Sequence, residues 1–511
     1  MNFSGKIPNR FFMRMAIITA VVFFVSMVTS VGLLSCEKPI TDPPMPELED
    51  TIPTVVIPFD INSIRDDYSD LAAADKVYQW GSHNVHDPSI LFDGQYYYCY
   101  STDAAYGVSI KPGIQIRRSK DLIDWQFIGW VFSDVPEQAA SYIRQQGGVP
   151  NRGLWAPYAL KVGKEFRLYY SLSSTPKPRL STIGLATAPT AVGPWTPRAL
   201  VVSSTDDATT QTNAIDPSVL VDTASGRQFL YYGSAWDGIY MLELDPVTGL
   251  AQKGGSRGRR IAQRGFTKGV PNGNIEGAEI IYNPEFQKYY LFISYDWLQT
   301  KYNVRVGRAD TPEGPFLDIH GEDINLEKDH APMALAPYKF NDHAGFQGVA
   351  HCAVFNQNET FFIAHQARPA FNSFFMNLHV RTLLWTPNGW PVASPERYAA
   401  ISQVPAIVAS ELEGAWEYID FNYRIVPGYD KEQISPDMQT SVRLVLEKDG
   451  FVGTSSEAKW SLADDLLTII WSDNRKDLLR VARGWDWEKK QNTLVFAGLN
   501  PNGYPVWGKK I

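Results

Sequence analysis

The chain has few basic residues and little α-helical periodicity. The first feature limits the partners it can bind, and the second limits its fold class. Its 511 residues carry 47 Lys and Arg against 55 Asp and Glu, with no basic cluster. Such a surface cannot neutralise a phosphate backbone, so nucleic acid is excluded as a partner. No long segment repeats its apolar residues at the α-helical period, which favours an all-β fold.

Cysteine is scarce as well, with three in the chain. Cys99 and Cys352 stand in apolar, strand-like contexts, YYYCYS and AHCAVF. Two buried free thiols are expected, and a disulfide between them is the alternative in an exported protein.

The composition is that of a globular protein rich in aromatic side chains. Hydrophobic residues make up 44% and charged residues 20%, which excludes a mostly disordered chain. The length excludes one small domain. Aromatics reach 13%, with 15 Trp and 25 Tyr, so carbohydrate is the first ligand class to consider.

The N-terminus predicts export. Lys6, Arg10 and Arg14 precede an apolar run at residues 15–34. The run ends in LLSC, which resembles the lipobox of bacterial lipoproteins and implies that Cys36 becomes a lipidated membrane anchor. An uncleaved membrane helix is the alternative.

Residues 1–35 are therefore expected to be a signal peptide. Their removal leaves 44 basic and 55 acidic side chains, a net charge of −11. Residues 36–58 are rich in proline and predict an extended spacer between the membrane anchor and the folded part. The anchored protein is expected at the outer membrane, on the cell surface or on the periplasmic side.

Five segments repeat one pattern: a polar or small residue, an apolar strand, a turn and an aromatic strand. They begin at Asp87, Ala156, Asp216, Glu276 and His351, 69, 60, 60 and 75 residues apart. Each reads as a hairpin, and a third apolar strand follows each one. Such units predict a five-bladed β-propeller over residues 59–408, in which the first strand of every blade lines a central channel.

Residues 409–511 form short strands with turns at roughly ten-residue spacing, which predicts a small antiparallel β-barrel or sandwich. Six tryptophans in this part indicate a Trp-rich core, with a sugar-stacking face as the alternative. They are Trp416, Trp460, Trp471, Trp485, Trp487 and Trp507.

Asp87, Asp216 and Glu276 come from different predicted blades, yet each precedes the inner strand of its unit. Carboxylates crowded in a channel can divide the roles of acid and base, as glycoside cleavage requires. The alternative is that the Asp-Pro pairs at Asp87 and Asp216 only start turns.

At these residues the chain resembles glycoside hydrolase family 43, and within it the arabinanases. The shared pieces span the predicted propeller: HDPSI at 86–90, IQIRRSKDLIDW at 114–125, LWAP at 154–157, IGLATA at 183–188, AIDPSV at 214–219, GSAWDGI at 233–239, IEGAEI at 275–280 and GVAHCAVF at 348–355. The resemblance implies an inverting hydrolase of α-1,5-L-arabinan. Asp87 is then the general base, Glu276 the general acid, and Asp216 the third carboxylate, which tunes the acid by like-charge repulsion.

The resemblance also implies that His351 ligates a calcium ion in the channel, completed largely by water. A channel histidine bonded to backbone or substrate is the alternative, because calcium prefers oxygen ligands.

Four further residues of the matching motifs, His86, Trp155, Ser234 and Trp236, are expected to bind substrate, with blade packing as the alternative for the two tryptophans. One departure is Tyr158, where arabinanases commonly carry Asp. It leaves internal and terminal cleavage open.

The expected protein is an exported, membrane-anchored and monomeric endo-arabinanase. Two alternatives stay open: an exo-acting α-L-arabinofuranosidase or β-xylosidase on the same fold, and a non-catalytic glycan-binding lipoprotein.

Overall fold

The computed structural model describes residues 59–71, 74–104, 111–205, 212–264, 266–267, 270–271, 274–422 and 438–511. The predicted signal peptide, Cys36 and the proline-rich spacer lie outside these residues. Within the described part of the chain, no helix combines the length and the apolarity that crossing a membrane requires.

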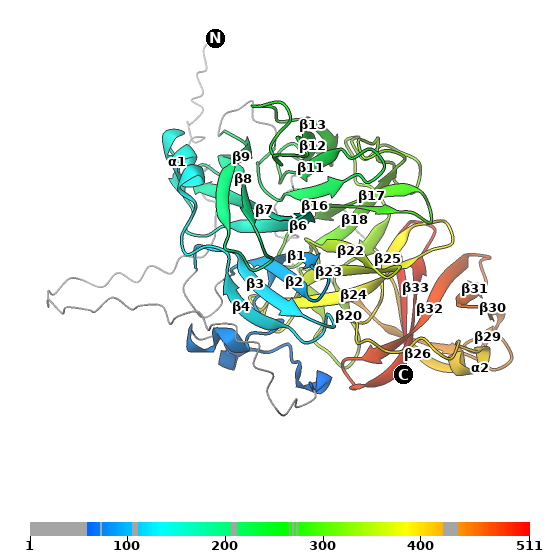
Figure 1. The fold of residues 1–511 in the computed structure, drawn as a ribbon. Coiled ribbons are helices and arrows are strands. Elements are labelled where there is room, and N and C mark those ends of the chain that lie inside the picture. The colour runs from blue at the N-terminus through cyan, green and yellow to red at the C-terminus, as the bar shows by residue number, and fades with distance from the viewer. Residues whose placement is uncertain are drawn as a thin grey trace, which may run out of the picture. The chain divides into compact units, whose positions relative to one another are not determined.

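Antiparallel strands in chain order form most of the sheets (Figure 1). The first sheet holds β1 (His86–Phe92), β2 (Tyr97–Thr102), β3 (Gln115–Ser119) and β4 (Gln126–Trp130). The second holds β6 (Trp155–Val162), β7 (Glu165–Thr175), β8 (Ser181–Ala188) and β9 (Thr196–Ser203), with β5 (Val149–Pro150) paired to β7.

The third sheet holds β10 (Ser218–Val221), β11 (Gln228–Tyr232), β12 (Ile239–Leu244) and β13 (Arg259–Ala262). The next holds β16 (Ile275–Asn283), β17 (Lys288–Tyr295), β18 (Asn303–Ala309) and β19 (Met333–Leu335). Strands β14 (Phe266–Thr267) and β15 (Val270–Pro271) form a separate ribbon.

The last sheet of this part is larger. Its strands β22 (Ala353–Gln357), β23 (Thr360–Pro369), β24 (Asn377–Trp385) and β25 (Pro391–Ala393) follow the same meander order. It is extended by β20 (Tyr338–Lys339), β21 (Phe346–Gln347) and β27 (Gln439–Thr440). The arrangement is propeller-like, and all five predicted hairpins are present as antiparallel pairs.

One helix of nine residues, α1 (Glu137–Gln145), was not predicted from periodicity. It is short and buries only Ala139, Ala140 and Ile143, too few positions to mark a helical repeat in the sequence. A four-residue helix, α2 (Ala409–Leu412), and three 3₁₀ turns, η1 (Ile61–Ser63), η2 (Ser69–Leu71) and η3 (Ala74–Gln79), complete the helical elements described. Cys99 and Cys352 are buried and free, which confirms the thiol interpretation.

A left-handed residue stands just before or at the start of each inner strand. These equivalent positions are Asp87 (φ 51°), Ala156 (φ 39°), Asp216 (φ 59°), Gly277 (φ 59°) and His351 (φ 49°). The register expected for Glu276 is therefore wrong by one residue, because Gly277 occupies the place of Asp87 and Asp216. Pairing of β16 with β17 shifts between Glu276 and Glu279, as pairing of β1 with β2 shifts between His86 and Ser89, so Glu276 occupies the place of His86.

The backbone N–H of each left-handed residue donates to a side chain of another strand or loop. Asp87 donates to Gln366 Oε1, Ala156 to Thr102 Oγ1, Asp216 to Ser171 Oγ, Gly277 to Asp216 Oδ2 and His351 to Ser294 Oγ. These bonds satisfy buried amides and hold the inner strand starts beside their neighbours.

The C-terminal part is a closed antiparallel barrel. Its strands are β26 (Gly414–Asp420), β28 (Val442–Leu446), β29 (Phe451–Val452), β30 (Ser455–Ala463), β31 (Leu466–Ile470), β32 (Lys476–Asp486), β33 (Gln491–Leu499) and β34 (Pro505–Lys510). Trp416, Trp460 and Trp507 are buried, which confirms the Trp-rich core for these three. Trp471, Trp485 and Trp487 are half-buried.

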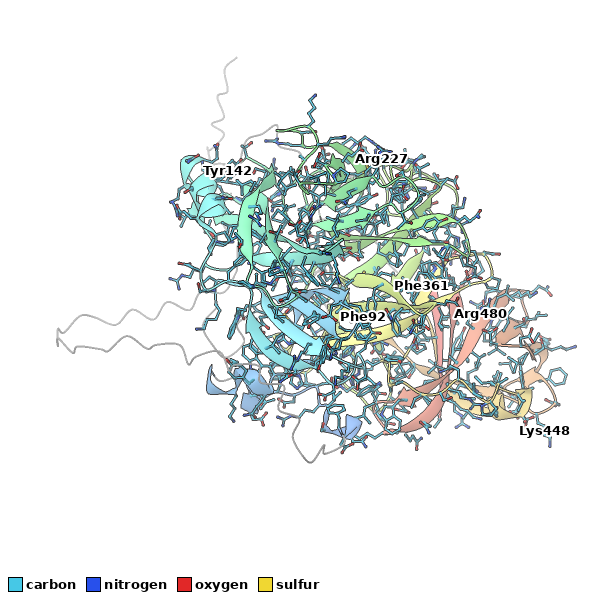
Figure 2. The ribbon with its side chains drawn as sticks, viewed as in Figure 1. Phe92, Tyr142, Arg227, Phe361, Lys448 and Arg480 are labelled. Atoms are coloured by element: carbon cyan, nitrogen blue, oxygen red, sulfur yellow. The ribbon has the colours of Figure 1, made fainter. Side chains whose placement is uncertain are left out.

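Aromatic and ionic contacts join the barrel to the sheets before it. Phe361 of β23 packs edge-on against Trp385, with ring centroids 5.1 Å apart, and the Trp385 carbonyl accepts from Arg480 Nε of β32 at 3.1 Å. Figure 2 labels Phe361 and Arg480. Lys509 of β34 lies 3.0 Å from Glu396, which follows β25. The two parts therefore share a packed boundary.

Candidate active site

Asp87 lies at the start of β1 with both carboxylate oxygens bound by side chains. Oδ1 is 3.0 Å from Nδ1 of His351, and Oδ2 is 2.7 Å from Nδ1 of His86. Thr102 Oγ1 also donates to Oδ2 at 2.8 Å. The three partners come from different places, His351 before β22, His86 at the start of β1 and Thr102 at the end of β2. Asp87 therefore bonds several side chains besides starting a turn.

The surroundings of Asp87 keep it ionised. Burial alone would raise its pKa, but the imidazoles of His351 and His86 outweigh burial and hold the pKa well below the usual range. Burial likewise opposes charge on His351, yet Asp87 and the neighbouring carboxylates raise the pKa of His351 to about 10. The result is a buried ion pair whose anion is available to accept a proton.

Asp216 has the opposite character. Burial raises its pKa to about 8, and the charges of Glu276 and Asp87 add to that rise, against His351 and the Gly277 amide. The Gly277 N–H donates to Asp216 Oδ2 at 3.1 Å. Asp216 therefore retains its proton near neutral pH while Asp87 is charged.

Glu276 is half-buried, and each of its oxygens accepts one hydroxyl. Ser234 Oγ donates to Oε2 at 2.7 Å, and Tyr302 Oη donates to Oε1 at 2.8 Å. Ser234, expected to bind substrate, thus contacts the predicted acid. Tyr302 was not singled out in the sequence, because nothing in KYNVRV distinguishes it from a core tyrosine.

The Gly277 backbone and the His351 ring lie between the three carboxyl groups. Asp216 bonds the residue after Glu276, and a Cβ on that glycine would lie 3.1 Å from the His351 ring, which pairs with Asp87. The fold thus brings together residues that lie up to 264 positions apart. His86, expected to bind substrate, lies against Asp87.

The two tryptophans differ in exposure. Trp155 is half-buried at the first position of β6. Trp236 is 43% exposed, and the Arg179 guanidinium lies 4.2 Å from its ring centroid. Ala235 and Trp236 both have positive φ, 53° and 50°, a strained loop of the kind found at binding sites.

Tyr158, which departs from the arabinanase pattern, lies in β6, two residues after the left-handed Ala156. Burial raises its pKa well above the usual value, and the nearby Glu279 adds to the rise. Glu279 is itself buried, with a pKa raised by burial to about 8. A phenol and a carboxyl group from different sheets thus meet in the interior.

The side chains around His351 could hold a calcium ion only if water supplied most of its ligands. Nδ1 faces Asp87, which leaves Nε2 for a cation, and calcium prefers oxygen ligands. Among the described residues, the one group of three His, Cys, Asp or Glu side chains close enough to share an ion is Glu396, Asp486 and Glu488, which lies elsewhere. A cation at Nε2 would have to replace the proton that the raised pKa of His351 keeps there, and water would supply its remaining ligands.

We expect Asp216→Asn to stabilise the protein at neutral pH. The pKa of Asp216 is about 8 in the folded protein and 3.8 in the unfolded chain. Between these values Asp216 ionises only in the unfolded chain, so the stability of the wild type falls as pH rises from about 4 to 8. Asn cannot ionise. At about 1.4 kcal/mol per pKa unit, reduced by relaxation around the charge, the gain is about 2–3 kcal/mol at pH 8.

Chemical denaturation of both proteins at pH 4, 6 and 8 measures this gain. It should be near zero at pH 4 and largest at pH 8. A difference that does not change with pH would show that Asp216 is ionised in the folded protein.

Known proteins resemble this chain along most of its described length. The family model of the glycosyl hydrolases family 43 matches residues 81–391, and that of a C-terminal lipocalin-like domain matches residues 395–508. An extracellular endo-alpha-(1->5)-L-arabinanase of Thermotoga petrophila is 26% identical, over 86% of this chain and 96% of its own. The crystal structure of endo-1,5-alpha-L-arabinanase from Thermotoga petrophila RKU-1 aligns with a TM-score of 0.71 and 26% identity, over 85% of this chain and 99% of its own.

Another relative matches a shorter part of this chain. An extracellular exo-alpha-(1->5)-L-arabinofuranosidase of Cellvibrio japonicus is 27% identical, over 63% of this chain and 89% of its own.

Proposed function

This chain belongs to the glycosyl hydrolases of family 43, and from that premise we propose that it is an inverting endo-α-1,5-L-arabinanase. The observation that carries the mechanism is the difference in protonation between two neighbouring carboxyl groups. Asp87 is held ionised by two imidazoles, whereas Asp216 beside Glu276 retains a proton near neutrality.

In the proposed reaction, Asp87 accepts a proton from a water molecule that attacks the anomeric carbon of an arabinofuranosyl unit. Glu276 gives a proton to the departing glycosidic oxygen. Asp216, which is neutral and accepts the Gly277 N–H, lies nearby and does not act on Glu276 through like-charge repulsion in this state. His351 and His86 hold Asp87 in place and compensate its charge. Trp155 and Trp236 supply apolar faces for the sugar chain.

Internal cleavage is supported by the Thermotoga petrophila relative, whose similarity spans both parts of the chain. Exo-acting arabinofuranosidase activity is the second candidate, and the Cellvibrio japonicus relative favours it. Product analysis on linear arabinan separates the two, because internal cleavage yields a ladder of oligomers and terminal cleavage one small product. Early ¹H NMR of the new reducing ends should show inverted anomeric configuration.

Turnover of aryl β-xylosides without turnover of arabinan would contradict the proposed substrate. Absence of turnover on either substrate by the soluble protein would leave glycan binding as its role and overturn the enzyme assignment.

We also infer five blades and a domain boundary near residue 408. The inner strands contact one another in a closed cycle, β1 with β6, β6 with β10, β10 with β16, β16 with β22, and β22 with β1. The two family models meet between residues 391 and 395. These observations support a propeller of residues 59–408 followed by a barrel domain of residues 409–511.

Calcium is proposed at His351, with water completing its ligands. A bound divalent cation would supply positive charge next to the crowded carboxyl groups. We expect a chelator to lower the midpoint of thermal unfolding by a few degrees and calcium to restore it. In His351→Ala the added calcium should have no effect, and an unchanged midpoint in chelated wild type would contradict the site.

Export and anchoring through Cys36 are proposed from the N-terminal sequence and from the extracellular relatives. The protein is proposed to act as a monomer. Cys36→Ala should move the protein from the membrane fraction to the soluble fraction of the cell, and unchanged fractionation would contradict the anchor.

A further inference from the structure

Tyr302 is a buried side chain whose hydroxyl bonds the proposed general acid, Glu276. It precedes β18 directly, is 1% exposed and packs in the core that includes Met333 and Val349. Its hydroxyl donates to Glu276 Oε1 at 2.8 Å. A ring fixed by core packing on a residue next to a strand cannot swing away when substrate arrives.

The second hydroxyl at Glu276 is held differently. Ser234 lies in the loop between β11 and β12, and its Oγ is 2.7 Å from Oε2. The same loop carries the exposed Trp236 two residues later. A serine hydroxyl turns about its C–O bond, so it can donate to an ionised oxygen or accept from a protonated one.

The two contacts make the oxygens of Glu276 unequal. The phenol has one proton, and that proton is directed at Oε1. Burial raises the pKa of Tyr302 well above its usual value, with the charge of Glu276 as the next cause, so the phenol keeps its proton. A proton on Oε1 would require the phenol hydrogen to turn away from its acceptor inside a packed core, whereas a proton on Oε2 requires only that the Ser234 hydroxyl turn about its C–O bond.

We propose that Tyr302 is the positioning residue that confines the acidic proton of Glu276 to Oε2, the oxygen on the side of Ser234 and Trp236. The inference rests on the proposed role of Glu276 as general acid. It also places the departing part of the sugar chain on the Trp236 side of the carboxyl group, because the proton must face the oxygen that leaves.

The test removes only the hydroxyl, with Tyr302→Phe, and compares two leaving groups. Linear arabinan needs protonation of the departing alkoxide, whereas 4-nitrophenyl α-L-arabinotrioside releases a stable phenolate. We expect kcat on arabinan to fall about 10- to 100-fold with KM changed less than about twofold. The nitrophenyl substrate should lose less than about threefold.

Tyr290→Phe is the matched control. Tyr290 is a buried tyrosine whose hydroxyl donates to the Gly389 carbonyl at 2.6 Å, away from the carboxyl groups. It should leave both activities unchanged. Equal losses on both substrates in Tyr302→Phe, or no loss on arabinan, would overturn the proposal.

A second variant guards against misfolding and against failure of the underlying mechanism. Ser234→Ala should lower kcat on arabinan less than Tyr302→Phe does, because the Tyr302 hydroxyl still directs the proton to Oε2. A larger loss of kcat would reverse the two roles and overturn the proposal.

Glu276→Gln tests the acid itself. If Glu276→Gln shows no dependence on the leaving group, the proposed function fails, independently of Tyr302.

Discussion

Glu276→Gln and Asp87→Asn are each expected to lower kcat on arabinan by about 10²- to 10⁴-fold, the usual contribution of a general acid or base. Both substitutions preserve shape. The amide at 276 cannot give a proton to the leaving oxygen, although Ser234 and Tyr302 still surround it. The amide at 87 cannot take a proton from water and no longer compensates His351 and His86.

Steady-state kinetics on linear arabinan measure both losses, and thermal unfolding checks that the variants are folded. Glu327→Gln, at an exposed carboxylate, is the control and should retain wild-type kcat. On a nitrophenyl substrate, Glu276→Gln should recover much of its activity and Asp87→Asn should not. Wild-type turnover by either variant would refute its assigned role.

Lys509→Met is expected to destabilise the protein by about 3–5 kcal/mol, the cost of leaving buried charge without its partner. Lys509 is 1% exposed in its side chain, with Nζ 3.0 Å from Glu396 Oε1 and 3.2 Å from Asp486 Oδ1. Glu488 is a third close partner, and Lys509 lowers its pKa to about 2. These carboxylates come from both sides of the boundary between the sheets and the barrel.

Chemical denaturation measures the loss, and Lys510→Met provides a neighbouring control. Lys510 is only half-buried and donates to the Glu411 carbonyl, so its replacement should cost less than about 1 kcal/mol. Adding Glu488→Gln to Lys509→Met should recover part of the stability, because Glu488 is the carboxylate that Lys509 keeps ionised, and its replacement removes an uncompensated charge. A cost below 1 kcal/mol for Lys509→Met would show that the cluster is open to water.

The hairpins were predictable because their signals are local. Turn residues such as Asp93-Gly94 and the apolar and aromatic runs on either side lie within one short segment, and β1 and β2 pair across that turn. The buried state of Cys99 and Cys352 follows from the same apolar contexts. Local steric and hydrophobic preferences suffice for such features.

The site was predictable only as a set of residues. Asp87, Asp216, Glu276, His351 and Ser234 were all named from sequence, and the fold brings them together. The expected register of Glu276 failed, since Gly277, one residue later, holds the left-handed position that Asp87 holds in β1. Tyr302 was missed, because a tyrosine before a strand has the same sequence signature whether it meets a carboxylate or the core.

By itself, therefore, the sequence determined the strand order, the turns and which acids stand near the inner strand starts, since each depends on neighbours a few residues away. Only the tertiary structure decided which acid is charged and which holds a proton. Asp87 owes its charge to His351, 264 positions along the chain, and Asp216 its proton to burial beside Glu276. Desolvation and Coulomb forces act between groups adjacent in space, and that adjacency exists only once the chain has folded.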